Sequence, residues 1–496
     1  MKSKLKSLAG ETIIYGLSSI LGRFLSFILT PVYTNYLDTN QYDFVIYSFS
    51  IVALLNVVYS FGMETAYFRF YNFDNQEQSK KAFSNAYLFI NGISLIFTLI
   101  LVIGSDFFGN LIASKGVQSV GYLFILAILM PFIDALTYIP YGYLRMSRQA
   151  KAFAITKFLA ILVTVCLNFL FLIPFHMQAE GVFLAQIIGS FCLFLYFLPI
   201  LKRNLRFNID STLIRQMLKF GIPTIPAAIS SIILQVADRP ILKELTNSDL
   251  AITTYQVNYR LGIPMMIFVT VFEYAWKPFY LSNYKDEDSK ELYARILTYF
   301  TLVSSFIFLF FSFFMVYFVQ VPFIGGKLIN PKYWEGLNII PIILVAYFFN
   351  GMFTNFSAGF LIEKQTKYLP LAVGLAAIIN VVANFILIPM FGYEGAAWST
   401  LIAYMFSAVV LYYYSLKVYP IKYEWGRIAI IIVAVATVFA ISKVLLINSV
   451  IYGILFKVAL ILAYLAILVI FGFFSKEELQ SIRNFIKFRK KNDKQQ

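Results

Sequence analysis

The chain has 496 residues, of which 60% are hydrophobic and only 13% are charged. A water-soluble domain of this length would need far more polar surface, so the composition indicates a protein whose solvent is lipid. The formal net charge of +15 would suit a nucleic-acid-binding protein. The placement of the charges, described below, argues against that class.

Apolar segments long enough to cross a bilayer recur from one end of the chain to the other. They are continuous apolar runs and not short alternating stretches, so they predict helices instead of a barrel. We predict an all-α integral membrane protein with about fourteen transmembrane helices, each needing about 20 apolar residues. In chain order, the predicted spans are 12–36, 44–68, 82–103, 120–143, 153–175, 181–201, 217–237, 251–272, 292–319, 336–362, 369–390, 396–416, 425–444 and 450–473. Cys166 and Cys192 fall inside spans and are predicted to be small buried hydrophobic residues.

The positions of lysine and arginine predict which loops face the cytoplasm. With the N-terminus inside, the two termini and every second loop carry most of the basic residues, as expected for a bacterial inner-membrane protein. The basic charge then reflects topology, and no nucleic acid partner is expected. No cleaved signal peptide is expected either. The basic residues in outward loops are Lys115, Arg239, Lys243, Lys327, Lys332 and Lys443.

The second half of the chain repeats sequence elements of the first half in the same order. Two six-helix halves inserted with the same orientation are typical of transporters, which bind substrate between them. The alternative is an old duplication that is kept only for packing. The matched elements are Asn168-Phe169 with Asn384-Phe385, Ile173-Pro174 with Ile388-Pro389, Glu180-Gly181 with Glu394-Gly395, Arg148–Lys151 with Lys364–Lys367, and Glu64–Tyr67 with Glu273–Trp276.

The repeat and the loop lengths predict four parts of the chain. Residues 1–208 form an N-terminal six-helix lobe, and residues 209–418 form a C-terminal six-helix lobe. Residues 419–475 add two transmembrane helices, and residues 476–496 form a basic cytoplasmic tail. The tail either lies on an anionic inner leaflet or is an ordinary positive-inside tail.

This six-plus-six-plus-two arrangement resembles the polysaccharide biosynthesis and O-antigen (Wzx-type) flippase family of the multidrug/oligosaccharidyl-lipid/polysaccharide (MOP) superfamily. The residues that carry the resemblance are Leu21-Gly22-Arg23 through Pro31, Ala237-Asp238-Arg239 and the repeated Asn…Ile-Pro…Glu-Gly elements. The resemblance implies alternating-access transfer of undecaprenyl-diphosphate-linked oligosaccharide from the inner to the outer leaflet, for O-antigen, capsule or exopolysaccharide. It also implies a cavity lined by the first, second, seventh and eighth helices, with a polysaccharide polymerase and glycosyltransferases as partners.

Charges inside the predicted spans are the strongest functional signal, because lipid makes an isolated charge costly. Arg23 would lie about 17 Å along a helix that begins at Thr12, at about 1.5 Å per residue, and Arg260 lies inside the eighth span. A guanidinium pairs well with phosphate oxygens, so both arginines are predicted to bind the diphosphate. A structural pair with a buried acid or carbonyl is the alternative for each. Asp238 and Arg239, expected to reach the membrane interface, are weaker candidates for substrate contact.

Three acidic residues are candidates for gating or ion coupling. Glu64 and Glu273 match in the repeat, and Glu273 can pair with Lys277 four residues on, either as a gate or as a static pair. Asp134 lies in the middle of the fourth span, opposite Asn350 in the repeat. It holds either a proton or a hydrogen bond to a neighbouring helix. No cofactor is expected, and a proton or sodium gradient is the candidate driving force.

Prolines predict bends in two spans. Pro223 and Pro226 interrupt the seventh span, and Pro131 and Pro140 interrupt the fourth. Proline frees a carbonyl and bends a helix, which suits either a moving helix or plain packing.

Enzyme motifs are missing from the sequence, so a transporter is predicted. Gly325-Gly326-Lys327 lacks the first glycine and the Ser or Thr of a phosphate-binding loop, and His176 has no metal-binding partners nearby in sequence.

A cation-coupled multidrug or organic-ion exporter of the same superfamily is the first alternative, although two deep arginines weigh against cationic drugs. A membrane polysaccharide polymerase or ligase is the second, and the short outer loops argue against it.

Overall fold

The computed structural model describes residues 20, 22, 24, 27–113, 116–445, 447 and 449–474. These residues are mostly helical, and the strands among them form one antiparallel hairpin of two short strands, β1 (Pro322–Phe323) and β2 (Gly326–Lys327). Twelve helices in this part of the chain are long and apolar enough to cross a membrane. The predicted all-α membrane fold is therefore confirmed, and the hairpin contains the glycine-rich sequence that was rejected as a phosphate loop.

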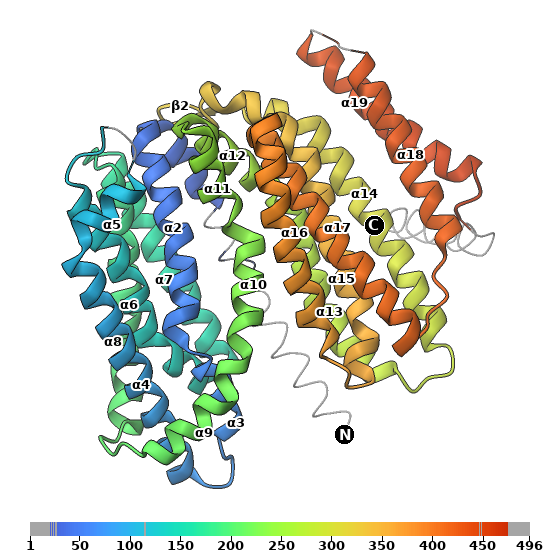
Figure 1. The fold of residues 1–496 in the computed structure, drawn as a ribbon. Helices are drawn as coiled ribbons and strands as arrows, with labels where there is room; N and C mark the ends of the chain where they lie inside the picture. The colour runs from blue at the N-terminus through green and yellow to red at the C-terminus, as the bar shows by residue number, and fades with distance from the viewer. Residues whose placement is uncertain are drawn as a thin grey trace, which may run out of the picture. The chain divides into compact units, whose positions relative to one another are not determined.

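The chain forms two compact units, which are described separately (Figure 1). The first unit consists of Met1–Leu281 and Val319–Tyr419, and the second of Ser282–Phe318 and Pro420–Gln496. In the first unit, the N-terminal half contains α2 (Thr39–Ser60), α3 (Met63–Phe70), α4 (Gln76–Ile103), α5 (Ser105–Ile112), α6 (Val120–Met146), α7 (Ala150–Leu172) and α8 (Ala179–Asn204). Its C-terminal half contains α9 (Ser211–Gly221), the 3-10 helix η1 (Ile222–Thr224), α10 (Ile225–Val236), α11 (Asp238–Thr246), α12 (Asp249–Leu261), α13 (Ile263–Asn283), the 3-10 helix η2 (Pro331–Ile339), α15 (Ile340–Ile362), α16 (Tyr368–Phe391) and α17 (Tyr393–Val418).

Twelve of the fourteen predicted spans correspond to helices long enough to cross a membrane. The first predicted span, 12–36, lies largely outside the described residues, although residues 27–36 are helical. The prediction of one continuous eighth span was wrong, because the chain there forms α12 and α13 with a break at Gly262. Ile343 packs so closely that a Cβ at Gly262 would lie 2.5 Å from its Cγ2 atom. Pro264, which has no N–H to donate, lies two residues after Gly262 and favours the break.

Helix α6 lies at the centre of the N-terminal half, where it contacts α2, α4, α5 and α8 (Figure 1). The core between these helices buries aromatic and aliphatic side chains such as Tyr59, Phe83 and Ile139. Pro131 and Pro140 both lie inside α6, as the sequence predicted. Because lipid provides no hydrophobic force between helices, close packing of such side chains holds the half together.

The seventh predicted span is divided where its two prolines lie. Pro223 falls in η1 and Pro226 in the first turn of α10, so the span consists of α9, η1 and α10. Helix α9 packs on α3 and α4, and Met217 belongs to the core of the N-terminal half. Asp210 caps α9 by accepting from the backbone N–H of Leu213 at 3.0 Å, and it pairs with Lys81 of α4 at 2.6 Å. Helix α10 instead packs on α16, so one sequence span serves both halves.

A buried ion pair joins the two halves of the first unit. Lys243 of α11 donates from Nζ to Oδ2 of Asp43 in α2 at 2.6 Å, and to the backbone carbonyl of Ile112 at 2.6 Å. The two side chains are 13% and 0% exposed. Nearby, the side chain of Asn35 donates to the backbone carbonyl of Lys327 at 2.8 Å. These contacts lie at the ends of the helices that the basic-residue pattern places outside.

The second unit is a small bundle of α14 (Ser289–Phe318), α18 (Trp425–Val444) and α19 (Val450–Ile470). Its core contains Phe313, Val438 and Leu468, and the hydroxyl groups of Ser305 and Tyr464 lie 2.5 Å apart. The two helices predicted to follow the repeat thus share a unit with α14, which the repeat assigns to the second lobe. The predicted tail, 476–496, lies outside the described residues.

Cys166 and Cys192 are free but exposed, so the prediction that they are buried was wrong. Both lie on helices with many exposed apolar neighbours, such as Leu170 and Phe191. In a membrane protein, an apolar side chain needs no burial against protein, because lipid surrounds it.

Candidate functional site

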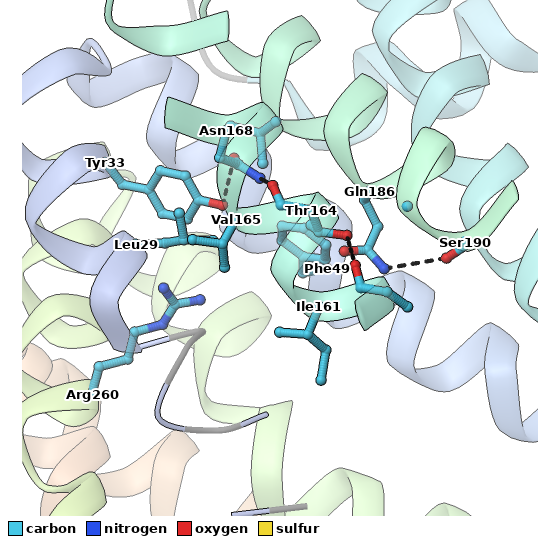
Figure 2. A pocket seen from close by; sticks show the side chains of 13 residues that line it. Leu29, Tyr33, Phe49, Ile161, Thr164, Val165, Asn168, Gln186, Ser190 and Arg260 are labelled. Carbon is cyan, nitrogen blue, oxygen red and sulfur yellow. Dashed lines mark hydrogen bonds between the residues drawn. The ribbon is translucent and has the colours of Figure 1, made fainter. Parts of the chain in front are cut away.

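A polar cavity of about 290 Å³ lies inside the first unit, and side chains of both halves line it (Figure 2). Most of its wall comes from the N-terminal half, and α12 contributes one residue from the C-terminal half. The polar side chains of the lining are Tyr33, Thr164, Asn168, Gln186, Ser190 and Arg260. The cavity contains one charged side chain, that of Arg260, and no acid among the lining residues described.

The Arg260 guanidinium reaches the cavity from α12. Its Cζ atom lies 5.9 Å from the centre of the Tyr33 ring, toward which the side chain points in Figure 2. Its Nη1 atom is buried and has no hydrogen-bond partner among the residues that the structure describes. Arg260 also lines a second cavity, of about 120 Å³, together with Arg239, Gln256 and Tyr42. A guanidinium with one buried, unused donor is suited to bind an anion.

The position of Arg260 follows from how α12 is held. Ser248 caps the helix by accepting from the backbone N–H of Ala251 at 3.2 Å. Two residues before Arg260, Asn258 donates to the backbone carbonyl of Tyr333 in η2 at 2.8 Å. Gly336 permits this contact, because a Cβ there would lie 2.3 Å from Nδ2 of Asn258. The packing of η2 against α12 therefore fixes the helix that carries the arginine.

Hydroxyl and amide groups form the wall opposite Arg260. The Tyr33 hydroxyl donates to Oδ1 of Asn168 at 2.9 Å, and Asn168 donates to the backbone carbonyl of Thr164 at 2.8 Å (Figure 2). Gln186 donates to the Ser190 hydroxyl at 3.5 Å. Such groups both donate and accept hydrogen bonds, so they can bind a neutral polar ligand. Sequence reasoning missed this wall, although Asn168 had already stood out in the repeat.

Asp134 lies directly behind the cavity wall. Ser190, which lines the cavity, donates to Oδ1 of Asp134 at 2.7 Å. The side chain of Asn56 in α2 also hydrogen-bonds the Asp134 carboxyl. The predicted hydrogen bond to a neighbouring helix is thus present, and the predicted role in ion coupling stays a prediction.

Asp238 is buried, with 2% of the residue exposed, and its position at the membrane interface stays a prediction. Its Oδ1 atom accepts from Nη1 of Arg239 at 2.8 Å. Its Oδ2 atom accepts from the hydroxyl of Tyr255 and, at 3.4 Å, from that of Thr400. Because both oxygens already have donors, the geometry gives Asp238 a structural pairing.

Arg239 is also buried, with 6% exposed, and its position at the membrane interface stays a prediction as well. Besides Asp238, it donates from Nε to Gln256 at 2.6 Å and from Nη1 to the backbone carbonyl of Gln235. Its Cζ atom lies 4.7 Å from the centre of the Tyr259 ring. The helix end that looked exposed in the sequence is covered by α12. Tyr255, Tyr259 and Gln256 of α12 contact the Arg239 guanidinium.

The two repeat-matched glutamates both form ion pairs. Glu64 pairs with Arg145 of α6 at 3.0 Å, and Glu273 pairs with Lys277 at 3.6 Å, the partner that its sequence spacing predicted. All four side chains are more than a third exposed. Such pairs contribute little to stability, and whether they open during transport stays a prediction.

Arg23 lies outside the described residues. The residue before it, Gly22, lies against the cavity wall, since a Cβ at Gly22 would be 2.7 Å from Cδ1 of Ile161.

The described part of the chain contains no cluster of three or more His, Cys, Asp or Glu residues that could hold a metal ion.

The chain matches one known family and several solved structures. The family model described as "Polysaccharide biosynthesis protein" matches residues 8–280. Lipid II flippase MurJ in an inward closed conformation is similar over 93% of this chain and 99% of its own, with 18% identity and a TM-score of 0.74. An inward-facing MATE multidrug resistance transporter of the MOP superfamily is similar over 82% of this chain and 97% of its own, with 14% identity and a TM-score of 0.64. No curated protein sequence matches the chain. The likeness to the solved structures shows that the fold is shared.

Proposed function

Because the chain belongs to the polysaccharide biosynthesis protein family, we propose that it is a flippase for lipid-linked oligosaccharides. Its substrate would be undecaprenyl-diphosphate-linked glycan, moved from the inner to the outer leaflet of a bacterial inner membrane by alternating access. The glycan would serve O-antigen, capsule or exopolysaccharide synthesis, supplied by glycosyltransferases and passed to a polymerase. The lipid II flippase among the structures with this fold supports a lipid-linked substrate.

One observation carries the proposal: the buried Nη1 of Arg260, which has no hydrogen-bond partner among the described residues, at a cavity that both halves of the first unit line. Burying a cationic donor without a partner costs free energy that a purely structural role would not repay. A phosphate oxygen supplies both the negative charge and the acceptor. Arg23, on the opposite half of the repeat, would be the second phosphate ligand.

The rest of the cavity suits a sugar. Tyr33, Asn168 and Gln186 present hydroxyl and amide groups beside the apolar side chains of Leu29 and Phe49. A sugar ring has polar hydroxyl groups around less polar faces, so this mixture of groups matches it. The phosphate would lie at Arg260 and the first sugar against the polar wall.

A multidrug exporter is the second candidate, because MATE transporters share the fold. A cation-binding cavity needs acidic or aromatic ligands that compensate a positive charge. In the described lining, the only charge is that of Arg260, which repels a cation. Cavity charge therefore favours an anionic substrate.

The proposal predicts that Arg260→Gln strongly lowers glycan export without loss of the protein. Hydrogen bonds to charged groups contribute about 1.5–3 kcal/mol, so we expect at least about a tenfold drop in surface polysaccharide. Arg260→Lys, which keeps the charge without the planar fork, should retain partial export. The measurement is surface glycan and accumulated lipid-linked precursor in a deletion strain complemented with each variant.

Arg295→Gln is the matched control, because Arg295 is half-exposed and paired with Glu291, away from every proposed site residue. It should leave export near the wild-type level. Wild-type export by Arg260→Gln, at equal protein amounts in the membrane, would contradict the proposal. Raised drug sensitivity of the deletion strain with intact glycan would favour the multidrug alternative.

A further inference from the structure

Asp134 is a partly buried carboxyl group, in a membrane-spanning helix, without a cationic partner in the described part of the chain. It lies near the middle of α6, and its carboxyl interacts with the hydroxyl of Ser190 and the amide of Asn56. The ion pairs among the described residues involve other acids. By contrast, the buried Asp43 and Asp238 have Lys243 and Arg239 beside them. Burial favours the neutral form of a carboxyl group that lacks such a partner.

A single hydroxyl group links this carboxyl to the cavity. Ser190 donates to Oδ1 of Asp134 at 2.7 Å, and its oxygen accepts from Gln186 at 3.5 Å. Ser190 and Gln186 line the cavity, as does Arg260. A serine hydroxyl has one proton and two lone pairs, so it can pass a proton between the cavity and the carboxyl.

The ligand set around Asp134 fits a proton better than a metal cation. Hard metal cations in proteins are held by several oxygen ligands, usually with more than one carboxylate or carbonyl. The groups that bind the Asp134 carboxyl are one hydroxyl and one amide. The described residues also contain no group of three or more His, Cys, Asp or Glu side chains that could hold a metal ion.

The other titratable groups around Asp134 are mostly neutral. Tyr138 and Tyr141 of α6 interact with it electrostatically. Tyr138 also interacts with Tyr59 of α2. From α3, Glu64 also faces Tyr138, and its charge is paired with Arg145. From α8 the facing group is the Ser190 hydroxyl, and α4, α5 and α7 contribute no charged group that acts on this carboxyl among the described residues.

We propose that Asp134 is a proton-binding site whose occupancy is linked to anion binding at Arg260. The proposal rests on the proposed function, since it uses the same cavity. An anion in the cavity makes a second negative charge at Asp134 unfavourable, so binding of the anion promotes uptake of one proton. The proton comes from a hydronium ion of the solvent: one of its O–H bonds breaks, the O–H bond of the carboxyl group forms, and water is left. When the anion leaves, the proton is released.

Infrared difference spectroscopy on the full-length protein in vesicles of phosphatidylethanolamine and phosphatidylglycerol tests the proton site. Acidification should produce the C=O band of a protonated buried carboxyl group in the wild type. Asp134→Asn should lose this band, and Ser190→Ala should shift its frequency because one hydrogen bond to the carboxyl is removed. Asp210→Asn, at a partly exposed acid of the same unit that is paired with Lys81, should leave the band unchanged.

Inorganic pyrophosphate, used as the anion, tests the link. It should move the midpoint of the band to higher pH in the wild type, and Arg260→Gln should keep the band but lose the shift. A band that persists in Asp134→Asn overturns the proton site. If bound pyrophosphate leaves the pH midpoint of the band unchanged in the wild type, the proposed link between Asp134 and Arg260 is overturned. Should Asp134→Asn fail to fold, the Ser190→Ala frequency shift decides the assignment, and its absence overturns it.

The outcomes separate this proposal from the proposed function. Binding of pyrophosphate is measured independently by calorimetry on the same vesicles. If the wild type binds pyrophosphate and Arg260→Gln does not, the phosphate site stands whatever the infrared result. If neither binds it, the phosphate site fails first, and the link to Asp134 fails with it.

Discussion

Single residues show that a buried arginine can have either of two roles in this protein. Arg239 has acceptors for its donors in Asp238, Gln256 and a backbone carbonyl, whereas Nη1 of Arg260 has none in the described structure. The sequence places Arg239 just beyond the seventh predicted span and Arg260 inside the eighth, and it cannot show which guanidinium lacks a partner. The separation depends on which side chains face each guanidinium, and these come from distant parts of the chain.

At this scale we predict that Arg239→Gln destabilises the protein, because it leaves Asp238 buried without its cation. Removing one partner of a buried ion pair costs about 3–5 kcal/mol. The double variant Asp238→Asn/Arg239→Gln should recover part of this loss, since no charge is then stranded. Thermal unfolding in detergent measures both, with Arg260→Gln expected to unfold near the wild-type temperature. An unchanged midpoint for Arg239→Gln would contradict the structural role.

At the scale of helices, the break between α2 and α3 lies against the break between α9 and α10. The chain turns between α2 and α3 at Phe61 and Gly62, both with positive φ, and it turns between α9 and α10 at η1. Gly62 and Gly221 touch through their backbones, so that a Cβ at Gly221 would lie 2.8 Å from the carbonyl oxygen of Gly62. The prolines predicted the second break, and the contact with the first break appeared only in the fold.

We therefore predict that Gly62→Ala lowers stability. Gly62 has φ of 66°, and a Cβ there would lie 2.3 Å from the carbonyl oxygen of Gly221. The left-handed conformation alone costs a non-glycine residue about 1–2 kcal/mol, and the clash adds to it. Gly92→Ala is the control: a Cβ there meets nothing within 4 Å, and alanine favours a helix. Equal unfolding temperatures for the two variants would show that the contact is unimportant.

At the scale of the whole molecule, the basic-residue pattern predicts an orientation in the membrane that remains to be measured. In a C166S/C192S background, a cysteine at exposed Ile324, in a predicted outer loop, should react with an impermeant maleimide added to intact cells. A cysteine at exposed Asn208, in a predicted inner loop, should react only in inverted vesicles. The opposite labelling pattern would reverse the proposed direction of transport.

Composition and periodicity predicted much of the fold. Continuous apolar runs predicted twelve of the helices found, because a bilayer requires segments of fixed length whatever their neighbours are. The same reasoning failed at 251–272, where the helix is broken at Gly262, two residues before Pro264. It also failed for the cysteines, since hydrophobic character does not distinguish contact with lipid from contact with protein.

The sequence by itself determined that the chain is a helical membrane protein with a repeated architecture and a few costly internal charges, because length, hydropathy and charge are local properties. Only the tertiary structure decided which charges are already paired and which face a cavity. Arg260, Tyr33, Asn168 and Ser190 are far apart in the chain and meet only when α7, α8 and α12 pack. Electrostatic partnership is set by distances of a few ångströms between such segments, and no local pattern records those distances.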